Sequence, residues 1–442
     1  MRKTLTTLFV LSFLCISDGY AQWTFQGAFP DTNFKGTSGA HGLAVDPAGK
    51  VWLITFGQTG RDSIFNGTTW VRTLAIHVFN ANGTPAPFSP IKTVTVGAVT
   101  DTLFSTWSNR GIRADRNGNI LASVLGTGTN ASRLYRINYQ TGQGMNRILE
   151  PGSNGSPGVD TLGEIFLGRV APGNPIKIYD NSFAYLGNVV DTSVGFHRAL
   201  EASPNGNDVY WAGYTNHAIY RYHSDNGTIG PYTVGPNDTL LRGFDCESMG
   251  WNPTRTRLWL SAGSKADAPN RYPNFVTNYS INTWYAWNPA NGQITDSIKW
   301  DWRFSLDSTN IRPRAIGFSP DGNTAYVGCF GGSGYPPFLK YSRVSNVKPD
   351  PDVIPNGFIL AQNYPNPFNP TTEIRFQINK AGHTTLTVYD LTGKLVETLV
   401  DQELAVGGYT ATFDASKLAS GTYFYRLTQD GQSVAKKMLL TK

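Results

Sequence analysis

The chain has 442 residues and a formal net charge of +6, and only 15% of its residues are charged. That length suits two or three domains, and so dilute a charge argues against nucleic-acid binding and against long charged tails. The 47 glycines, 26 prolines and 13% aromatic residues are typical of strands joined by tight turns, not of a helical bundle. We therefore expect an all-β protein.

The first 21 residues have the pattern of a secretory signal peptide. The basic residues Arg2 and Lys3 precede an apolar run over residues 8–16, and small residues lie just before Gln22. The run is too short to cross a bilayer, and no later segment has the roughly 18 apolar residues that a spanning helix needs. The pattern predicts export, cleavage before Gln22, and no transmembrane segment.

Two cysteines, Cys246 and Cys329, follow the predicted signal peptide. In an exported protein they can form one disulfide, and the alternative is that both are small buried residues with free thiols. Their spacing is not that of metal ligands. The sequence therefore predicts no metal site and no cofactor, and no motif supports a calcium site.

One short pattern recurs through the body of the chain. An alternating apolar strand leads to a turn opened by Asp, Ser or Asn, often followed by Pro and Gly, and a second strand follows. The first side chain of such a turn can bond the backbone, Pro fixes φ, and Gly accepts positive φ. Five clear copies open their turns at Asp46, Asp115, Ser203, Asn252 and Ser319. A sixth, degraded copy is expected within residues 165–190, around the sequence Ala171-Pro172-Gly173.

Repeats with this long and irregular spacing suit the four-stranded blades of a β-propeller. The repeated residues resemble the NHL and SMP-30-like family of β-propellers over about residues 36–345. We predict a propeller over residues 22–346 with six blades, or seven if residues 23–29 supply a strand that closes the ring. A β-sandwich is the alternative, but a sandwich would not repeat one turn motif five times.

Residues 347–356 are polar and rich in proline, and we interpret them as a linker. The segment after them contains short strands with alternating apolar residues, separated by glycine-containing turns. This pattern predicts a small immunoglobulin-like β-sandwich over residues 357–442.

This C-terminal segment resembles the C-terminal sorting domain of the type IX secretion system, type A class. The resemblance rests above all on a proline-rich stretch before the first long strand and on one later turn. It implies that the type IX secretion machinery is a partner, and that the protein passes through the periplasm to the outside or to the outer cell surface. The motif residues are Tyr364, Pro365, Asn366, Pro367, Phe368, Asn369, Pro370, Gly393 and Lys394.

An ionisable side chain stands five positions before the turn residue in every clear copy of the repeat. The next residue is always small, and the one after it is always a large aliphatic. Because the first strand of each propeller blade is innermost, equivalent residues of successive blades form a ring around the central channel. We predict such a ring near one mouth of the channel, made of His41, Arg110, Arg198, Glu247 and Arg314.

A ring with excess positive charge can hold an anion, because Arg pairs with carboxylate or phosphate through two parallel hydrogen bonds. The leading interpretation is an exported, non-catalytic protein that binds a ligand or partner at the propeller mouth, such as an anionic saccharide or a surface protein. The opposing interpretation is that the ring charges pair with one another and with Asp245 or Glu201.

An enzyme is the alternative function: an extracellular hydrolase or lyase acting on a lactone, an ester or an anionic saccharide. A lactonase similar to SMP-30 would carry a metal-binding Glu in the first blade, where this chain has His41. A lyase would need a His as its base, and His197, His217 and His223 are further candidates. No catalytic residue can be assigned from these patterns. A purely structural surface protein is a third possibility.

Overall fold

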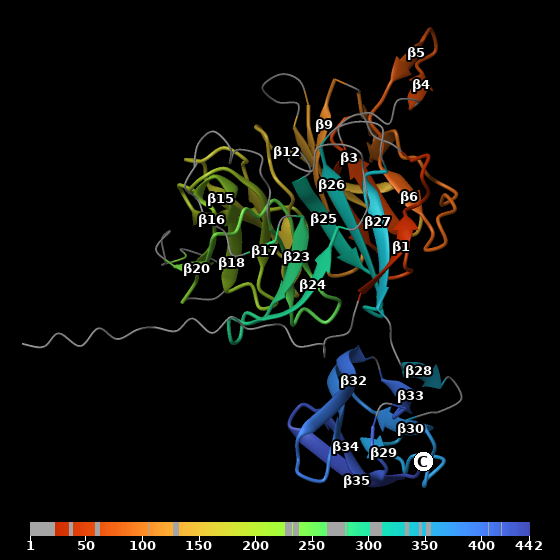
Figure 1. Cartoon of the computed structure of the whole chain (residues 1–442). Coiled ribbons are helices and arrows are strands. Elements are labelled where there is room, and N and C mark those ends of the chain that lie inside the picture. The colour runs from red at the N-terminus through yellow and green to blue at the C-terminus, as the bar shows by residue number, and fades with distance from the viewer. Residues whose placement is uncertain are drawn as a thin grey trace, which may run out of the picture. The chain divides into compact units, whose positions relative to one another are not determined.

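The computed structural model describes residues 23–442 apart from 35–38, 58–61, 105, 127–131, 226–231, 233–237, 263–278, 281, 301–311, 332–335, 344–346, 351–354, 405 and 417. The predicted signal peptide and part of the predicted linker therefore lie outside the described residues. The chain divides into two compact units, residues 23–343 and 344–442 (Figure 1). Strands dominate both units, and within the described ranges the single helical element is the short 3-10 turn η1 (Tyr214–Asn216). The all-β prediction is confirmed.

The N-terminal unit contains six antiparallel sheets, and each follows the previous one along the chain. The first sheet has three strands and the other five have four, with the last sheet completed by β1. The sheets are β2 (Ala40–Val45), β3 (Val51–Thr55) and β6 (His77–Phe79); β9 (Ser108–Ala114), β10 (Ile120–Leu125), β11 (Arg133–Ile137) and β12 (Gly144–Leu149); β13 (Gly158–Val159), β14 (Ile165–Gly168), β15 (Ile176–Tyr179) and β16 (Tyr185–Val190); β17 (His197–Ala202), β18 (Asp208–Gly213), β19 (Ala218–His223) and β20 (Thr239–Arg242); β21 (Met249–Trp251), β22 (Leu258–Ala262), β23 (Thr283–Trp287) and β24 (Ile294–Lys299); β25 (Arg312–Phe318), β26 (Thr324–Phe330), β27 (Phe338–Arg343) and β1 (Trp23–Ala28).

Two small hairpins accompany the first sheet. One is formed by β4 (Ser63–Phe65) and β5 (Trp70–Arg72), and the other by β7 (Thr93–Val96) and β8 (Val99–Thr102). The first hairpin projects from the rest of the unit (Figure 1).

Strand β1 joins the start of the N-terminal unit to its end. It pairs antiparallel with β27, from Trp23 opposite Arg343 to Ala28 opposite Leu339. The Arg343 guanidinium lies 4.9 Å from the centre of the Trp23 ring, and Trp23 Nε1 donates to Asp296. The strand at residues 23–28 therefore completes the sixth sheet and does not begin a seventh.

The first strands of successive sheets lie side by side. β2 contacts both β9 and β25, β17 contacts β13 and β21, and β21 contacts β25. An added Cβ on Gly111 in β9 would lie 2.2 Å from Ser156 Cα, just before β13, so these two sheets also approach closely. The aliphatic residue three positions before each turn is at most 2% exposed, and these residues are Leu43, Ile112, Leu200, Met249 and Ile316. They form part of the core between the sheets.

The repeated turn has the expected chemistry. Asp46 Oδ1 accepts hydrogen bonds from the backbone N–H groups of Ala48 and Lys50, at 2.9 and 3.0 Å. Between β13 and β14, Asp160 Oδ1 similarly accepts from backbone N–H groups of its own turn, those of Gly163 and Glu164, both at 2.8 Å. This turn is the sixth copy, so its predicted position within residues 165–190 was wrong: those residues form β14, β15 and β16, the later strands of the third sheet.

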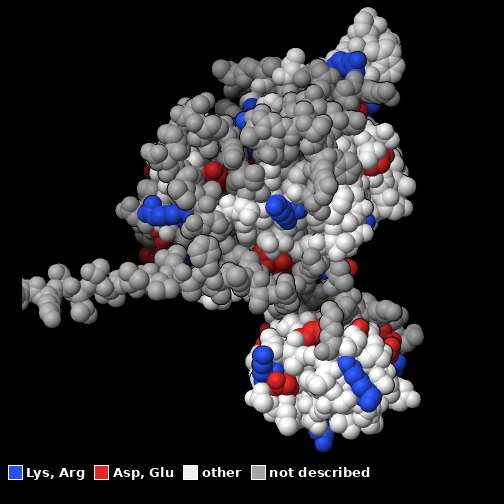
Figure 2. Space-filling view, in the orientation of Figure 1, with Lys and Arg blue, Asp and Glu red and all other residues white. Residues whose placement is uncertain are grey.

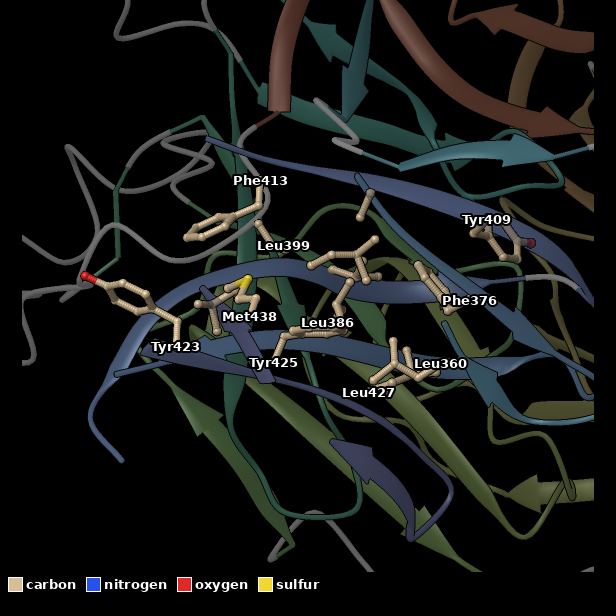
Figure 3. Packing of buried hydrophobic residues seen from close by; sticks show 14 of the residues in the cluster. Leu360, Phe376, Leu386, Leu399, Tyr409, Phe413, Tyr423, Tyr425, Leu427 and Met438 are labelled. Carbon is tan, nitrogen blue, oxygen red and sulfur yellow. The ribbon is translucent and has the colours of Figure 1, made fainter. Parts of the chain in front are cut away.

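The C-terminal unit is built from two four-stranded sheets that share one core. The first has the order β28 (Val347–Asp350), β33 (Gly407–Asp414), β30 (Thr371–Ile378) and β29 (Ile359–Leu360); the second has the order β32 (Leu395–Leu404), β31 (Gly382–Tyr389), β34 (Gly421–Gln429) and β35 (Gln432–Leu440). Alternate side chains of both sheets, such as Phe376, Phe413, Leu386 and Tyr425, point into the space between them (Figure 3).

The predicted linker differs from the structure at its start. Residues 347–350 form strand β28, which pairs with Gly408–Ala411 of β33. Three prolines and four polar residues among these ten positions suggested an irregular segment. Pro is nevertheless compatible with an edge strand, because one side of such a strand has no partner.

Candidate functional site

The predicted ring residues occupy irregular positions at the start of the first strands. The pairing register between the first and second strands skips His41, Arg110 and Arg314, and in the fourth sheet it skips Arg198 together with its neighbour. Such a β-bulge breaks the strict alternation of side chains and redirects the extra residue. The same local irregularity therefore recurs at four of the five ring positions.

The structure brings the ring side chains together. His41, Arg198, Glu247 and Arg314 line one enclosed cavity. Arg110 is close enough for its charge to act on His41, Arg198 and Arg314. The third sheet has Gly155 at the equivalent position, which adds no side chain.

A single carboxylate balances part of the positive charge of the ring. Arg314 Nε donates to Glu247 Oε2 at 2.5 Å, and Arg198 Nε lies 4.0 Å from the same oxygen. Arg314 is 6% exposed and Glu247 is 2% exposed, so this pair is desolvated. Burial lowers the pKa of Arg314 to about 10 although Glu247 opposes that shift.

Among the described residues, no carboxylate forms an ion pair with the Arg110 guanidinium. Its guanidinium lies 5.0 Å from the centre of the Phe56 ring, and its Nε has no hydrogen-bond partner among the described residues. Burial and the charges of Arg198 and Arg314 lower its pKa to about 10. The guanidinium is still protonated at neutral pH, so the ring retains excess positive charge.

His41 is the neutral member of the ring. It is 6% exposed, and neither ring nitrogen has a hydrogen-bond partner from another described residue. Burial, followed by the charges of Arg314, Arg198 and Arg110, holds its pKa well below the usual range. Phe56 and Phe330 pack against it with ring centres 5.2 and 6.1 Å away.

The ring cavity is small. Its volume is about 20 Å³, which is enough for one water molecule or one ion of similar size. Phe330 forms part of its aromatic surround, with the Arg314 guanidinium 3.9 Å from the ring centre. Sequence reasoning missed Phe56 and Phe330, because they lie at the ends of second strands, outside the repeated motif.

The two carboxylates that were expected to neutralise the ring have other partners. Glu201 Oε1 lies 2.5 Å from Arg113 Nη2, and Asp245 contacts Nδ1 of His217. Among the described residues that line the ring cavity, Glu247 is the one carboxylate.

The other candidate histidines do not line the ring cavity. His197 is fully buried and stacks on Trp211 with ring centres 3.6 Å apart, and burial lowers its pKa to about 3. His217 contacts Asp245, and His223 Nδ1 lies 2.7 Å from Asp208. Within the described ranges, no group of three or more His, Cys, Asp or Glu side chains is arranged to hold a metal ion.

Both cysteines are buried free thiols. The sequence left open either a disulfide between them or two buried free thiols, and the structure has the free thiols. Burial raises the pKa of Cys246 to about 12 and the pKa of Cys329 well above its usual range.

The proline-rich motif of the C-terminal unit is packed against the last strand. Phe368 is 2% exposed, and its backbone N–H and C=O bond to Leu439 and Thr441 at 3.0 Å. Asn366 Oδ1 accepts from the Leu439 N–H. Tyr364, in contrast, is 81% exposed. Gly393 has a φ of +83° in the turn after β31, and the Lys394 N–H donates to Asp390 in the same turn.

On the face shown in Figure 2, Lys and Arg are scattered among Asp and Glu on a mostly uncharged surface. None of the described helices is long and apolar enough to cross a membrane.

Comparisons with known proteins identify the C-terminal unit. Residues 362–441 match the family described as the secretion system C-terminal sorting domain. No curated protein matches the chain. Among solved structures, an auxiliary nutrient binding protein from Bacteroides thetaiotaomicron is similar, with a TM-score of 0.42 and 12% sequence identity over 72% of this chain and 75% of that chain. The C-terminal unit is thus a type IX secretion sorting domain, and it indicates export to the extracellular space or the cell surface.

Proposed function

We propose that residues 23–343 form a six-bladed β-propeller of the NHL and SMP-30-like kind, and that the exported protein binds a small anionic group in its central ring. Six successive sheets, neighbouring first strands and closure by β1 support the propeller. We further propose that residues 344–442 have an immunoglobulin-like topology, which their two facing sheets support.

The charge of the ring is the observation that carries the binding proposal. Three guanidinium groups face one carboxylate, and the histidine among them is held neutral by its surroundings. An uncompensated buried charge is costly, so an anion that enters this cavity relieves a penalty that the folded protein otherwise bears. Arg110 and His41 have the open hydrogen-bonding positions.

The size of the cavity limits what enters it. A volume of about 20 Å³ admits a monatomic anion, or one carboxylate or sulfate oxygen of a larger ligand. An anionic saccharide would therefore bind by inserting its charged substituent, with the sugar ring outside the cavity. A neutral sugar offers only hydroxyl groups, which carry no negative charge to offset that of the guanidinium groups.

The test is thermal unfolding of the full-length protein with sodium bromide, formate or sulfate, each replacing sodium methanesulfonate at constant ionic strength. If the dissociation constant is near 1 mM, 100 mM anion adds about 2.7 kcal/mol and raises the midpoint by a few degrees. Arg110→Ala/Arg198→Ala should lose this increment.

Arg343→Ala is the matched control, because Arg343 is paired with Asp296 at 2.6 Å outside the ring. It should lower the starting midpoint and keep the increment from the anion. An increment that is equal in the double variant and in the control would refute the ring as the binding site.

A further inference from the structure

A second cavity lies at the other end of the same first strands, next to the repeated turns. Its volume is about 320 Å³, against about 20 Å³ for the ring cavity. Sites for small organic molecules usually measure roughly 300–1,000 Å³. Leu43, Arg113 and Ile316 border both cavities, so the two follow one another along the centre of the unit. We call this second space the turn-side cavity.

Four of the six residues that stand two positions before the repeated turns border this cavity. Three of the six first strands have glycine at this position and one has alanine. At Gly317 the packing requires glycine, because an added Cβ would lie 2.3 Å from Leu43 Cδ2. Only two of the six strands have a long side chain at this position, and both side chains, those of Arg113 and Glu201, are charged. The six residues are Ala44, Arg113, Gly158, Glu201, Gly250 and Gly317.

Arg113, Glu201 and Arg255 form a charged cluster in the turn-side cavity, and the exposed Arg116, which donates to Leu162 O, also borders it. Arg113 Nη2 lies 2.5 Å from Glu201 Oε1 and donates to Met249 O at 2.8 Å. Arg255 Nη1 donates to Val159 O at 2.7 Å. Glu201 is 1% exposed, and burial raises its pKa to about 7 although both arginines favour its ionised form.

The three charges do not balance, since two cations share one carboxylate. Arg113 Nε is buried and has no hydrogen-bond partner among the described residues. The other two carboxylates of the lining are engaged elsewhere: Asp115 lies 2.8 Å from Arg136, and Asp46 accepts from Trp52 and from its own turn. The negative charge of Asp160 also acts on Arg255. The open group of the cavity is therefore the buried Arg113 Nε donor.

Apolar side chains form part of the remaining wall, together with Arg116 and Asn252. Leu43 and Ile316 are buried at the inner end of the cavity, and the exposed turn residues Pro47, Pro253 and Pro320 lie at its border. A ligand that suits both parts has a single negative charge and an apolar body.

We propose that the turn-side cavity is a second binding site, which takes a small organic carboxylate with an apolar ring or branched body. The carboxylate faces Arg113 and Arg255, where Arg can pair with both of its oxygens, and the body lies between the leucine, isoleucine and proline side chains. This site is separate from the ring and does not depend on the ring binding an anion.

Benzoate is the probe, and benzamide is its neutral control of nearly the same shape. Binding to the full-length protein is measured by calorimetry in 200 mM sodium chloride, so that any halide site in the ring is already exposed to its ligand. Benzoate should bind saturably in the millimolar range or below, and at least tenfold more tightly than benzamide. Equal binding of the two compounds, or no binding of benzoate, would overturn the proposal. A uronate that binds more tightly than benzoate would contradict the proposal that the ligand has an apolar body.

Two substitutions in the cavity should act in opposite directions. Arg255→Gln removes one cation and should weaken benzoate binding at least tenfold, whereas Glu201→Gln removes the competing carboxylate and should strengthen it several-fold. Arg221→Gln is the matched control, because this half-exposed arginine pairs with Asp238 on an outer strand. If Arg255→Gln unfolds the protein, the Glu201→Gln result decides by itself. Benzoate affinity that is unchanged in Glu201→Gln, or equal in the Arg255 and Arg221 variants, contradicts the site.

Discussion

Glu247 Oε2 accepts a hydrogen bond from Arg314 Nε at 2.5 Å, and Arg198 Nε lies 4.0 Å from the same oxygen. One carboxylate oxygen thus joins the fourth, fifth and sixth sheets at the centre of the N-terminal unit. Because the Arg314–Glu247 pair is almost fully buried, water does not solvate the charge that remains when one partner is replaced. We therefore expect the ring charges to contribute to the stability of the fold and also to form a candidate binding site.

Replacing this carboxylate should destabilise the protein strongly. Glu247→Gln leaves Arg314 and Arg198 without their counter-charge, and breaking a buried pair in this way costs about 3–5 kcal/mol. We expect the loss to shrink when bromide is added, because an anion in the ring then supplies the missing charge. Urea unfolding with and without bromide measures both effects.

The matching variant for Glu247→Gln is Asp296→Asn. It breaks the pair between Asp296 and Arg343, which is also largely buried but lies outside the ring. This variant should be destabilised too, and bromide should not rescue it. Equal rescue of both variants would show a general salt effect.

Predictions from the sequence were correct for features that depend only on residues close together in the chain. The turn at Asp46 depends on residues within four positions, so one chain is enough to recognise it. The ring residues were found by counting back from such turns, and the structure brings them together. The degraded sixth copy was placed wrongly because its ring position is Gly155, which has no ionisable side chain to mark the repeat.

Features that depend on distant pairing could not be predicted. Strand β1 pairs with β27 at the far end of the unit, and no local pattern distinguishes that from an extra blade. Glu201 was considered as a partner for the ring, yet its partner is Arg113 in a neighbouring layer. A single sequence indicates which residues are charged but not which of them share a layer after the strands are placed.

Stability should fall as the pH drops below neutral, and two histidines contribute to this loss. Burial lowers the pKa of His197 to about 3, and it holds the pKa of His41 well below its usual range. In the unfolded chain both titrate near pH 6.5. The unfolded state therefore binds more protons below that pH, so both histidines lower the stability as the pH falls. His197 removes about 2 kcal/mol of stability between pH 7.5 and 5.0.

Urea unfolding of His197→Gln at pH 7.5 and 5.0 tests this linkage. The variant should start less stable, because it loses the stack on Trp211, and should then lose about 2 kcal/mol less than the wild type between the two pH values. An identical loss in both proteins would mean that His197 is protonated in the folded state.

The two thiols should be inert while the protein is folded. Cys246 and Cys329 are both fully buried, and burial raises the pKa of each, so few thiolates form and none is accessible. A chain that starts at Gln22 should react with a thiol reagent at two sites only after urea unfolds it, and a reductant should leave its unfolding midpoint unchanged. Rapid labelling in the folded state, or a midpoint that falls with reductant, would contradict this.

The sorting motif should separate into a structural part and a recognition part. Phe368 is buried and contacts Phe413, with ring centres 6.0 Å apart, so Phe368→Ala should cost the C-terminal unit about 3–5 kcal/mol. Tyr364 is 81% exposed, so Tyr364→Ala should change stability by less than about 0.5 kcal/mol.

We expect both variants to reach the cell surface less well. Phe368→Ala should do so because its sorting domain unfolds, and Tyr364→Ala because the secretion machinery loses an exposed motif side chain that it recognises. Surface protein is measured with antibody on intact cells of a type IX-secreting bacterium, and melting of the purified variants gives their stability. Normal export of Phe368→Ala with a lowered melting point would show that the machinery tolerates an unfolded sorting domain, and normal export of Tyr364→Ala would assign recognition to other motif residues.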